Sequence, residues 1–274
     1  MTPAPPVRPA IRVTLGQLRV TDDHTANRET VVDAFMVAAT AHADLLVVPE
    51  YASAYDRRGV GAEHAEPLSG PFVEMLREQA ARTGVAVLAG TTLPGSSPQL
   101  AVNAVIAVDR SGALAGVYRK VHLYDAFGHR ESDRLEPGSA DAPPLVLDVD
   151  GVRFGVLTCY DLRFPESSRR VVDAGAEVLV VPAAWAAGPH KAMHWRALAI
   201  ARAIENTAVV VAVGQAGPGV TGRSLIVGPD GVVGLECDEV PVIRTADIDV
   251  SEIAAIRAVN PSLANRRYTT VPSR

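Results

Sequence analysis

The fold is decided by the stretch Asp44-Leu-Leu-Val-Val-Pro-Glu50, in which five consecutive apolar residues end at a carboxylate. A similar stretch, Val178-Leu-Val-Val-Pro-Ala183, occurs in the second half of the chain. An unbroken apolar run of this length is typical of a strand that is buried on both faces. Each run ends at a proline and enters a loop, where α/β sheets usually place catalytic groups. The sequence therefore predicts an α/β fold whose two halves contain equivalent strands.

Helices and strands alternate around these two runs. The predicted helices span residues 25–42, 70–82, 165 to a C-cap at Gly175, and 191–206, and further strands span 11–16, 85–89 and 208–213. Antiparallel hairpins are predicted over residues 102–119, 145–158 and 224–236, because turn residues separate apolar runs in each. No linker divides the chain, so we predict a flexible tail over residues 1–10 and a single domain over 11–274, with two sheets and helices outside both.

Composition narrows the class of protein. The 274 residues are 48% hydrophobic and 21% charged, which is ordinary for a folded protein and excludes a disordered or collagen-like chain. A net charge of -5 offers no basic surface, so nucleic acid is not an expected partner. No apolar stretch is long enough to cross a membrane, and the first ten residues do not resemble a signal peptide. We therefore expect a cytoplasmic protein without a membrane partner.

Cys159 is one of only two cysteines, which argues for free thiols instead of a disulfide framework. It follows the apolar strand predicted over residues 152–158, and Pro165 suits the first turn of the next helix. At such a turn the helix dipole and nearby amides are expected to lower the thiol pKa and so to produce a nucleophile. The alternative is a buried, inert cysteine. Cys237 lies in a polar segment and is interpreted as structural.

Glu50 and Lys120 are the other candidates for chemistry. A carboxylate fixed between Pro49 and Tyr51 is suited to act as a general base, although a carboxylate at the end of a strand can also simply face solvent. Lys120 closes the predicted strand over residues 114–119, where a lysine is usually an exposed residue that protects the strand from aggregation. Taken singly, neither residue identifies a site.

Three segments together resemble the nitrilase superfamily of carbon-nitrogen hydrolases. They are Val48-Pro-Glu-Tyr51, Tyr118-Arg-Lys-Val-His-Leu-Tyr-Asp125 and Thr158-Cys-Tyr-Asp-Leu-Arg-Phe-Pro-Glu166. The resemblance continues through Ala199-Ile-Ala-Arg-Ala-Ile-Glu-Asn206 and Gly222-Arg-Ser-Leu-Ile-Val-Gly-Pro-Asp-Gly231 to an Arg-Arg-Tyr268 ending, so it covers nearly the whole chain. It implies a four-layer α-β-β-α sandwich, a homodimer or larger homo-oligomer, and no cofactor or metal.

The resemblance also implies roles for residues at the site. Cys159 is the implied nucleophile, Glu50 the general base, and Lys120 the cation that faces the oxyanion of the intermediate. Glu131 matches a second glutamate that many relatives carry, with the implied role of orienting Lys120 and the substrate. Tyr51, Tyr160, Trp185 and Arg134 are the implied substrate-binding residues, with the backbone N–H of Tyr160 as the second oxyanion donor and Trp185 as a wall of the pocket. His129 stands where several relatives have an aromatic residue, so the shape of the pocket is not carried over.

The segment after Cys159 is similar to the branch that contains ω-amidases and deaminated-glutathione amidases. This likeness implies a small amide substrate that carries a carboxylate, with Arg134, His190 or Lys191 as its cation. The alternatives are an N-carbamoyl amino acid amidohydrolase or a nitrilase of the same superfamily and, further away, a binding protein without activity. A metal site built from His122, Asp125 and His129 is not expected, since their spacing fits no standard pattern.

Overall fold

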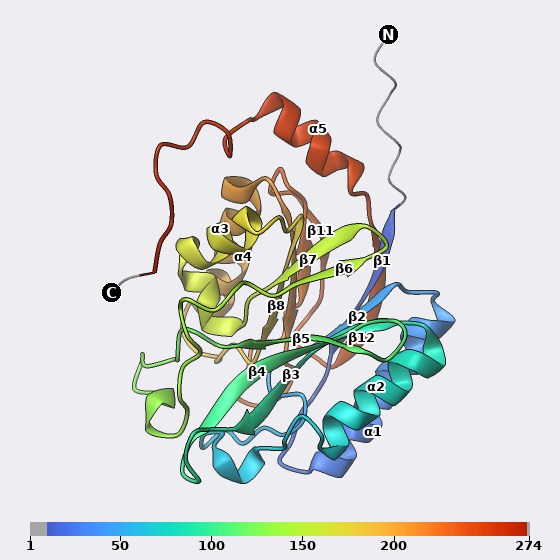
Figure 1. The fold of residues 1–274 in the computed structure, drawn as a ribbon, viewed down its shortest axis with the longest axis vertical. Helices are drawn as coiled ribbons and strands as arrows, with labels where there is room; N and C mark the ends of the chain where they lie inside the picture. The colour runs from blue at the N-terminus through green and yellow to red at the C-terminus, as the bar shows by residue number, and fades with distance from the viewer. Residues whose placement is uncertain (1–9, 273–274) are drawn as a thin grey trace.

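Two six-stranded sheets lie face to face in the middle of the molecule, and helices cover the outer face of each (Figure 1). The structure is a computed structural model that describes residues 10–272. The first sheet has the order β12 (Val242–Ile248), β1 (Ile11–Gln17), β2 (Leu45–Val48), β3 (Ala86–Pro94), β4 (Ala101–Val108), β5 (Leu114–Arg119). The second has the order β11 (Val233–Glu236), β10 (Leu225–Val227), β9 (Val209–Gly214), β8 (Val178–Ala183), β7 (Val152–Val156), β6 (Val146–Val149).

The helices form the two outer layers. Packed against the first sheet are α1 (His24–Thr40) and α2 (Pro71–Thr83), and against the second are α3 (Pro165–Asp173) and α4 (Lys191–Asn206). A further helix, α5 (Ser251–Val259), follows β12 and buries only Ile253. The predicted four-layer α-β-β-α sandwich is therefore confirmed.

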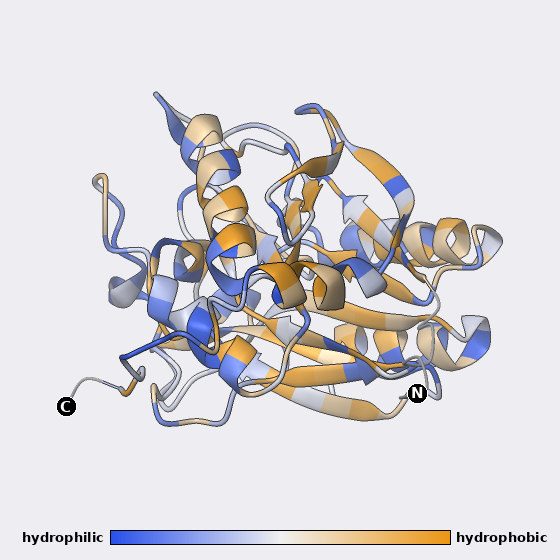
Figure 2. Ribbon diagram, turned by 90° about the horizontal axis from the view of Figure 1, so that it is seen from above, coloured by the Kyte–Doolittle hydropathy of each residue, from blue (hydrophilic) through white to orange (hydrophobic). Residues whose placement is uncertain are grey.

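Alternating side chains of the central strands build three separate hydrophobic layers. In β2, Leu45 and Val47 pack between the two sheets, whereas Leu46 and Val48 pack against α1 and α2. The same alternation holds in β8, where Val178 and Val180 face the first sheet and the intervening residues face α3 and α4. The apolar colour in Figure 2 accordingly runs along the strands between the helical layers. Burial on both faces explains why these strands read as continuous apolar runs.

The structure contains the strands and hairpins that the sequence predicts. β2 pairs in parallel with β1 and β3, and β8 pairs in parallel with β7 and β9. The three predicted hairpins are the antiparallel pairs β4–β5, β6–β7 and β10–β11. Helix α4 has the predicted bounds, and the predicted helix from Pro165 ends at Asp173, with Gly175 at a φ of 99° just beyond it.

Two features of the first sheet differ from the prediction. β3 continues to Pro94 instead of ending at Ala89, because it pairs with β4 along its length. β12 and α5 were not predicted from the sequence. β12 pairs with β1 at the edge of the sheet and has mostly half-buried side chains, so the apolar run that marks a central strand is missing there.

The predicted tail over residues 1–10 lies outside the described residues except for Ala10. Between residues 10 and 272, no helix is both long and apolar enough to cross a membrane.

Candidate active site

Glu50 follows β2 and is held at the end of the first sheet with 1% of its surface exposed. Its Oε1 accepts hydrogen bonds from Asn103 Nδ2 (2.7 Å) and Lys120 Nζ (2.9 Å), and its Oε2 accepts one from the backbone N–H of Ala184 (2.7 Å). Ala184 follows β8, so this last bond joins the loops after the two equivalent strands. The carboxylate is therefore fixed by groups from both sheets.

Gly90 in β3 allows this placement of Glu50. A Cβ at position 90 would lie 2.4 Å from the Cα of Glu50 and 2.5 Å from the carbonyl oxygen of Pro49. The next residue, Tyr51, has a φ of 58°, which non-glycine residues rarely adopt. Close backbone contact and a left-handed residue thus fix the turn that carries the carboxylate.

Lys120 follows β5 and is completely buried. Its Nζ lies 2.9 Å from Glu50 Oε1 and 2.8 Å from Glu131 Oε2, so it connects the two carboxylates. Burial alone would lower the pKa of Lys120, but the negative charges of Glu131 and Glu50 outweigh burial and raise this pKa well above 10.5. Lys120 is therefore an ammonium cation throughout the physiological pH range.

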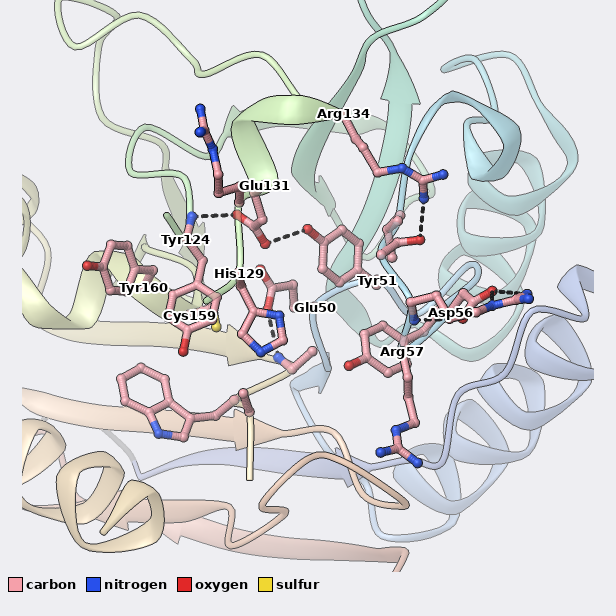
Figure 3. A pocket seen from close by; sticks show the side chains of 18 of the residues that line it. Glu50, Tyr51, Asp56, Arg57, Tyr124, His129, Glu131, Arg134, Cys159 and Tyr160 are labelled. Carbon is pink, nitrogen blue, oxygen red and sulfur yellow. Dashed lines mark hydrogen bonds and ion pairs between the residues drawn. The ribbon is translucent and has the colours of Figure 1, made fainter. Parts of the chain in front are cut away.

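Glu131 begins the 3-10 turn Glu131–Asp133 and accepts a hydrogen bond from Lys120 Nζ. The Tyr51 hydroxyl donates to its Oε1 (2.9 Å), and the backbone N–H of Tyr124 donates to its Oε2 (2.8 Å). These contacts, seen in Figure 3, hold both oxygens of the carboxylate.

Cys159 is the first residue of a 3-10 turn, Cys159–Arg163, between β7 and α3. Its φ is 46°, so the predicted nucleophile has the left-handed backbone conformation that non-glycine residues rarely adopt. Burial and the charge of Glu50 raise the pKa of the Cys159 thiol well above 9.0. The prediction of a lowered thiol pKa was wrong, because desolvation and the neighbouring carboxylates outweigh the positive charge of Lys120. Cys159 is therefore a neutral thiol at neutral pH.

Asp161 connects the turn that contains Cys159 to the end of β5 through hydrogen bonds. It is fully buried, and its Oδ2 accepts hydrogen bonds from the Thr158 backbone N–H (3.0 Å) and the Tyr118 hydroxyl (2.6 Å). Its Oδ1 lies 2.7 Å from Nδ1 of His122. Since Tyr118 and His122 flank Lys120 in the chain, one carboxylate positions the segments that carry the lysine and the cysteine.

A pocket of about 160 Å³ opens onto these groups. Figure 3 shows its labelled side chains, which come from several loops at one end of the two sheets. The lining includes all but one of the predicted site residues, namely Glu50, Tyr51, Glu131, Arg134, Cys159, Tyr160 and Trp185. Lys120 is the exception, because it is completely buried. Its Nζ contacts two residues of the lining, Glu50 and Glu131. The sequence prediction thus identified side chains that the fold brings together.

The three predicted candidates for a substrate-binding cation are in different settings. Arg134 lies at the pocket but donates to the carbonyl oxygen of Gly59 (2.7 Å) and pairs with Glu63 (2.9 Å). His190 is the residue before α4 and is not among the pocket-lining residues. Lys191 lines the pocket and is 7% exposed.

Sequence reasoning missed Asn103 and Ala184 as partners of Glu50. Asn103 had a detectable signal, because it is the one polar side chain in the buried strand Ala101–Val108. Ala184 acts through its backbone N–H, so its residue type carries no signal. Tyr124 and Lys191 were also not predicted to meet, yet Lys191 Nζ lies 2.6 Å from the Tyr124 hydroxyl.

The histidines considered as metal ligands point to different partners. His122 contacts Asp161, whereas His129 stacks on Tyr124, with ring centroids 5.5 Å apart. Asp125 accepts a hydrogen bond from the backbone of Ser132. Within residues 10–272, no cluster of three or more histidine, cysteine or acidic side chains could hold a metal ion.

Comparison with known proteins places this fold and site in a family. Residues 12–258 match the model of the carbon-nitrogen hydrolase family. The chain is 37% identical to a deaminated glutathione amidase of Escherichia coli O157:H7, over 93% of this chain and 97% of that protein. It is 34% identical to a 2-oxoglutaramate amidase of Bacillus subtilis, over 83% of this chain and 86% of that protein.

A solved structure adds a chemical observation on a relative. A mutant of the amidase from Nesterenkonia sp. AN1 superposes with a TM-score of 0.80 at 27% identity, covering 97% of each chain, and in that structure the acetamide moiety of fluoroacetamide is covalently added to the active-site cysteine. The present chain belongs to the carbon-nitrogen hydrolase family and is an amidase of the nitrilase superfamily, acting on carbon-nitrogen bonds other than peptide bonds.

Proposed function

We propose that this amidase hydrolyses a small carboxamide that carries a carboxylate, through a thioester on Cys159, and releases ammonia. The observation that carries the proposal is the convergence of Glu50, Lys120, Glu131 and Cys159 at one pocket. A volume of about 160 Å³ favours a substrate of few atoms, since pockets for drug-sized ligands are typically about 300 Å³ or larger. The relatives named for amide hydrolysis support the same reaction class.

The first step forms the thioester. Glu50 takes the proton of the Cys159 thiol, with which it is hydrogen-bonded, and the sulfur attacks the amide carbon. The charge that develops on the carbonyl oxygen is stabilised by the Lys120 ammonium and by the backbone N–H of Tyr160. Glu50 then gives its proton to the nitrogen, the C–N bond breaks, and ammonia leaves. The raised pKa of the thiol makes a base necessary, because little thiolate exists before substrate binds.

The second step regenerates the enzyme. Glu50 removes a proton from a water molecule, and the resulting hydroxide attacks the thioester carbon. The C–S bond breaks, the thiolate recovers its proton, and a carboxylic acid is released. The sum is the conversion of one amide and one water into one acid and one ammonia. Glu131, held by Tyr51 and Tyr124, keeps Lys120 in place in both steps.

Ammonia release from a panel of amides tests the proposal. The panel contains succinamate, glutaramate, neutral amides, nitriles and N-carbamoyl amino acids, each assayed with the wild type, Cys159→Ala and Cys237→Ala. We expect turnover of the carboxylate-bearing amides that is lost in Cys159→Ala and kept in Cys237→Ala. Release of carbon dioxide together with ammonia from the N-carbamoyl compounds would instead identify an N-carbamoyl amino acid amidohydrolase. Activity that survives Cys159→Ala would refute the proposed nucleophile.

Trapping provides evidence for the intermediate itself. A brief reaction with succinamate followed by acid quenching should leave a mass increase on the peptide that contains Cys159, and hydroxylamine should remove it. The cytoplasmic location and the homo-oligomeric assembly stay predictions, which fractionation and light scattering would test.

A further inference from the structure

Lys191 is a buried cation on the wall of the active-site pocket. It is the first residue of α4, it lines the pocket that contains Cys159, and it is 7% exposed. Its Nζ lies 2.6 Å from the neutral Tyr124 hydroxyl and 3.5 Å from the centre of the Phe127 ring. Among the described residues no ion pair joins it to an acidic side chain.

A second cation makes this region more positive. Arg163 lies over the ring of Trp185, 4.9 Å from its centre, and its Nε is buried without a hydrogen-bond partner. Burial and the positive charge of Arg163 lower the pKa of Lys191, whereas Cys159 acts on it in the opposite direction. Positive charge that is largely buried and has no counter-charge is costly, and an anionic ligand would reduce that cost.

The other positive side chains of the pocket are less suited to this role. Arg58 is paired with Asp56 (2.6 Å), Arg134 with Glu63 (2.9 Å) and Arg130 with Asp133 (3.4 Å). Arg57 is exposed and therefore screened by water. Lys191 combines burial, a place on the pocket wall and an uncompensated charge.

We propose that Lys191 binds the carboxylate of the substrate and thereby selects short monoamides of dicarboxylic acids over neutral amides. This inference rests on the proposed amide hydrolysis and names the group that determines its substrate class. The amide carbon lies at Cys159 while the carboxylate at the other end of the substrate meets the Lys191 ammonium and the Tyr124 hydroxyl. The main chain of Lys191 is fixed for this purpose, because Trp185 Nε1 donates to its carbonyl oxygen (2.9 Å).

Two substrates that differ in one charged group test the role of Lys191. Succinamate carries the carboxylate, and 4-oxopentanamide replaces it with a methyl ketone of similar shape. We expect the wild type to have the higher kcat/KM for succinamate. In Lys191→Met the ratio of the two kcat/KM values should fall roughly 10- to 100-fold, which corresponds to the loss of one charge-assisted hydrogen bond. Most of the change should lie in KM, and Lys191→Arg should restore part of the ratio.

Arg196→Gln is the matched control. It removes a cation from the same helix, but Arg196 is paired with Glu236 at the surface and does not line the pocket. The ratio should stay at its wild-type value in this variant. General damage to the fold lowers both kcat/KM values together and leaves the ratio unchanged, so the ratio separates substrate selection from a structural effect.

Binding without turnover provides a second measurement. Succinate should bind the Cys159→Ala variant, and adding Lys191→Met should weaken that binding by roughly 10-fold or more, measured by calorimetry. An unchanged ratio and unchanged succinate binding in the Lys191 variants would overturn the inference. Turnover of 4-oxopentanamide but not of succinamate would also overturn it while leaving amide hydrolysis in place. Ammonia release from neither compound, nor from any amide of the larger panel, would overturn both proposals.

Discussion

Asn103 donates a 2.7 Å hydrogen bond from Nδ2 to Oε1 of Glu50, the same oxygen that Lys120 Nζ contacts at 2.9 Å. The other polar atom of the Asn103 side chain, Oδ1, is buried and has no hydrogen-bond partner. A buried carbonyl without a partner costs free energy. We infer that Asn103 serves to position the Glu50 carboxylate. Its unpartnered oxygen lowers the stability of β4.

Replacing Asn103 with leucine should lower activity more than stability. We expect kcat/KM to fall by about 10-fold or more, since Glu50 loses a donor that orients it, while the melting temperature changes little because an unpartnered buried carbonyl is removed at the same time. Asn103→Asp should reduce kcat/KM further, because it places a second carboxylate beside Glu50. Steady-state kinetics and thermal denaturation of the two variants decide the matter. Wild-type activity in Asn103→Leu would show that the contact is incidental.

Lys120→Met should strongly reduce turnover and destabilise the protein. The substitution removes the cation between Glu50 and Glu131, so that two carboxylates remain close together without a counter-ion. We expect a loss of at least about 10²- to 10³-fold in kcat and a decrease of about 3 to 5 kcal/mol in the free energy of unfolding. Glu131→Gln should cost less stability, since the side chain of Glu131 is 19% exposed. Equal stability of Lys120→Met and wild type in urea denaturation would contradict this account.

Gly90→Ala should displace Glu50, although Gly90 itself does not line the pocket. The added methyl group would overlap the backbone of Glu50 and Pro49, so the turn that carries the carboxylate must move. Displacement of a catalytic group by about 1 Å can cost roughly 10²-fold in rate. Gly234→Ala is the control, because nothing lies within 4 Å of a Cβ at that position. The expected result is a large fall in kcat and a lower melting temperature for Gly90→Ala alone. Similar kinetics for the two variants would show that β3 accommodates the methyl group.

Stability should decrease in alkaline solution. Burial raises the pKa of Cys159, Tyr51 and Tyr118 in the folded protein above their ordinary values of 9.0 and 10.0. Below pH 9 both the folded and the unfolded chain hold these protons, and the full stability is present. Above that pH the unfolded chain releases them first, so the free energy of unfolding decreases as pH rises towards the folded-state pKa values.

Melting temperatures recorded between pH 7 and 11 provide the test. We expect a plateau up to about pH 9 and a steady decrease beyond it. Tyr118→Phe should have a smaller slope, because one group that titrates between the two states is removed, even though its hydrogen bond to Asp161 is lost as well. A flat profile to pH 11, or the same slope in Tyr118→Phe, would be inconsistent with these shifts.

Patterns of neighbouring residues were sufficient for most of the fold. The apolar runs at Leu45–Val48 and Val178–Ala183 indicated buried parallel strands, because burial on both faces excludes polar residues from such strands. β12 was missed because an edge strand keeps one side near solvent and its pattern is mixed. α5 was missed for a similar reason, since it buries a single side chain.

The candidate site was recognisable from three short segments, and the fold places Glu50, Lys120 and Cys159 together as their resemblance to the nitrilase superfamily implied. The tertiary structure alone decided how these groups are held and charged. Asn103 and the backbone of Ala184 reach Glu50 from positions 53 and 134 residues away in the chain. The Cys159 thiol has a raised pKa, although its place before a helix suggested a lowered one. Local sequence records secondary structure and residue types, whereas desolvation and charge at a site depend on atoms from distant segments, which meet only in the folded chain.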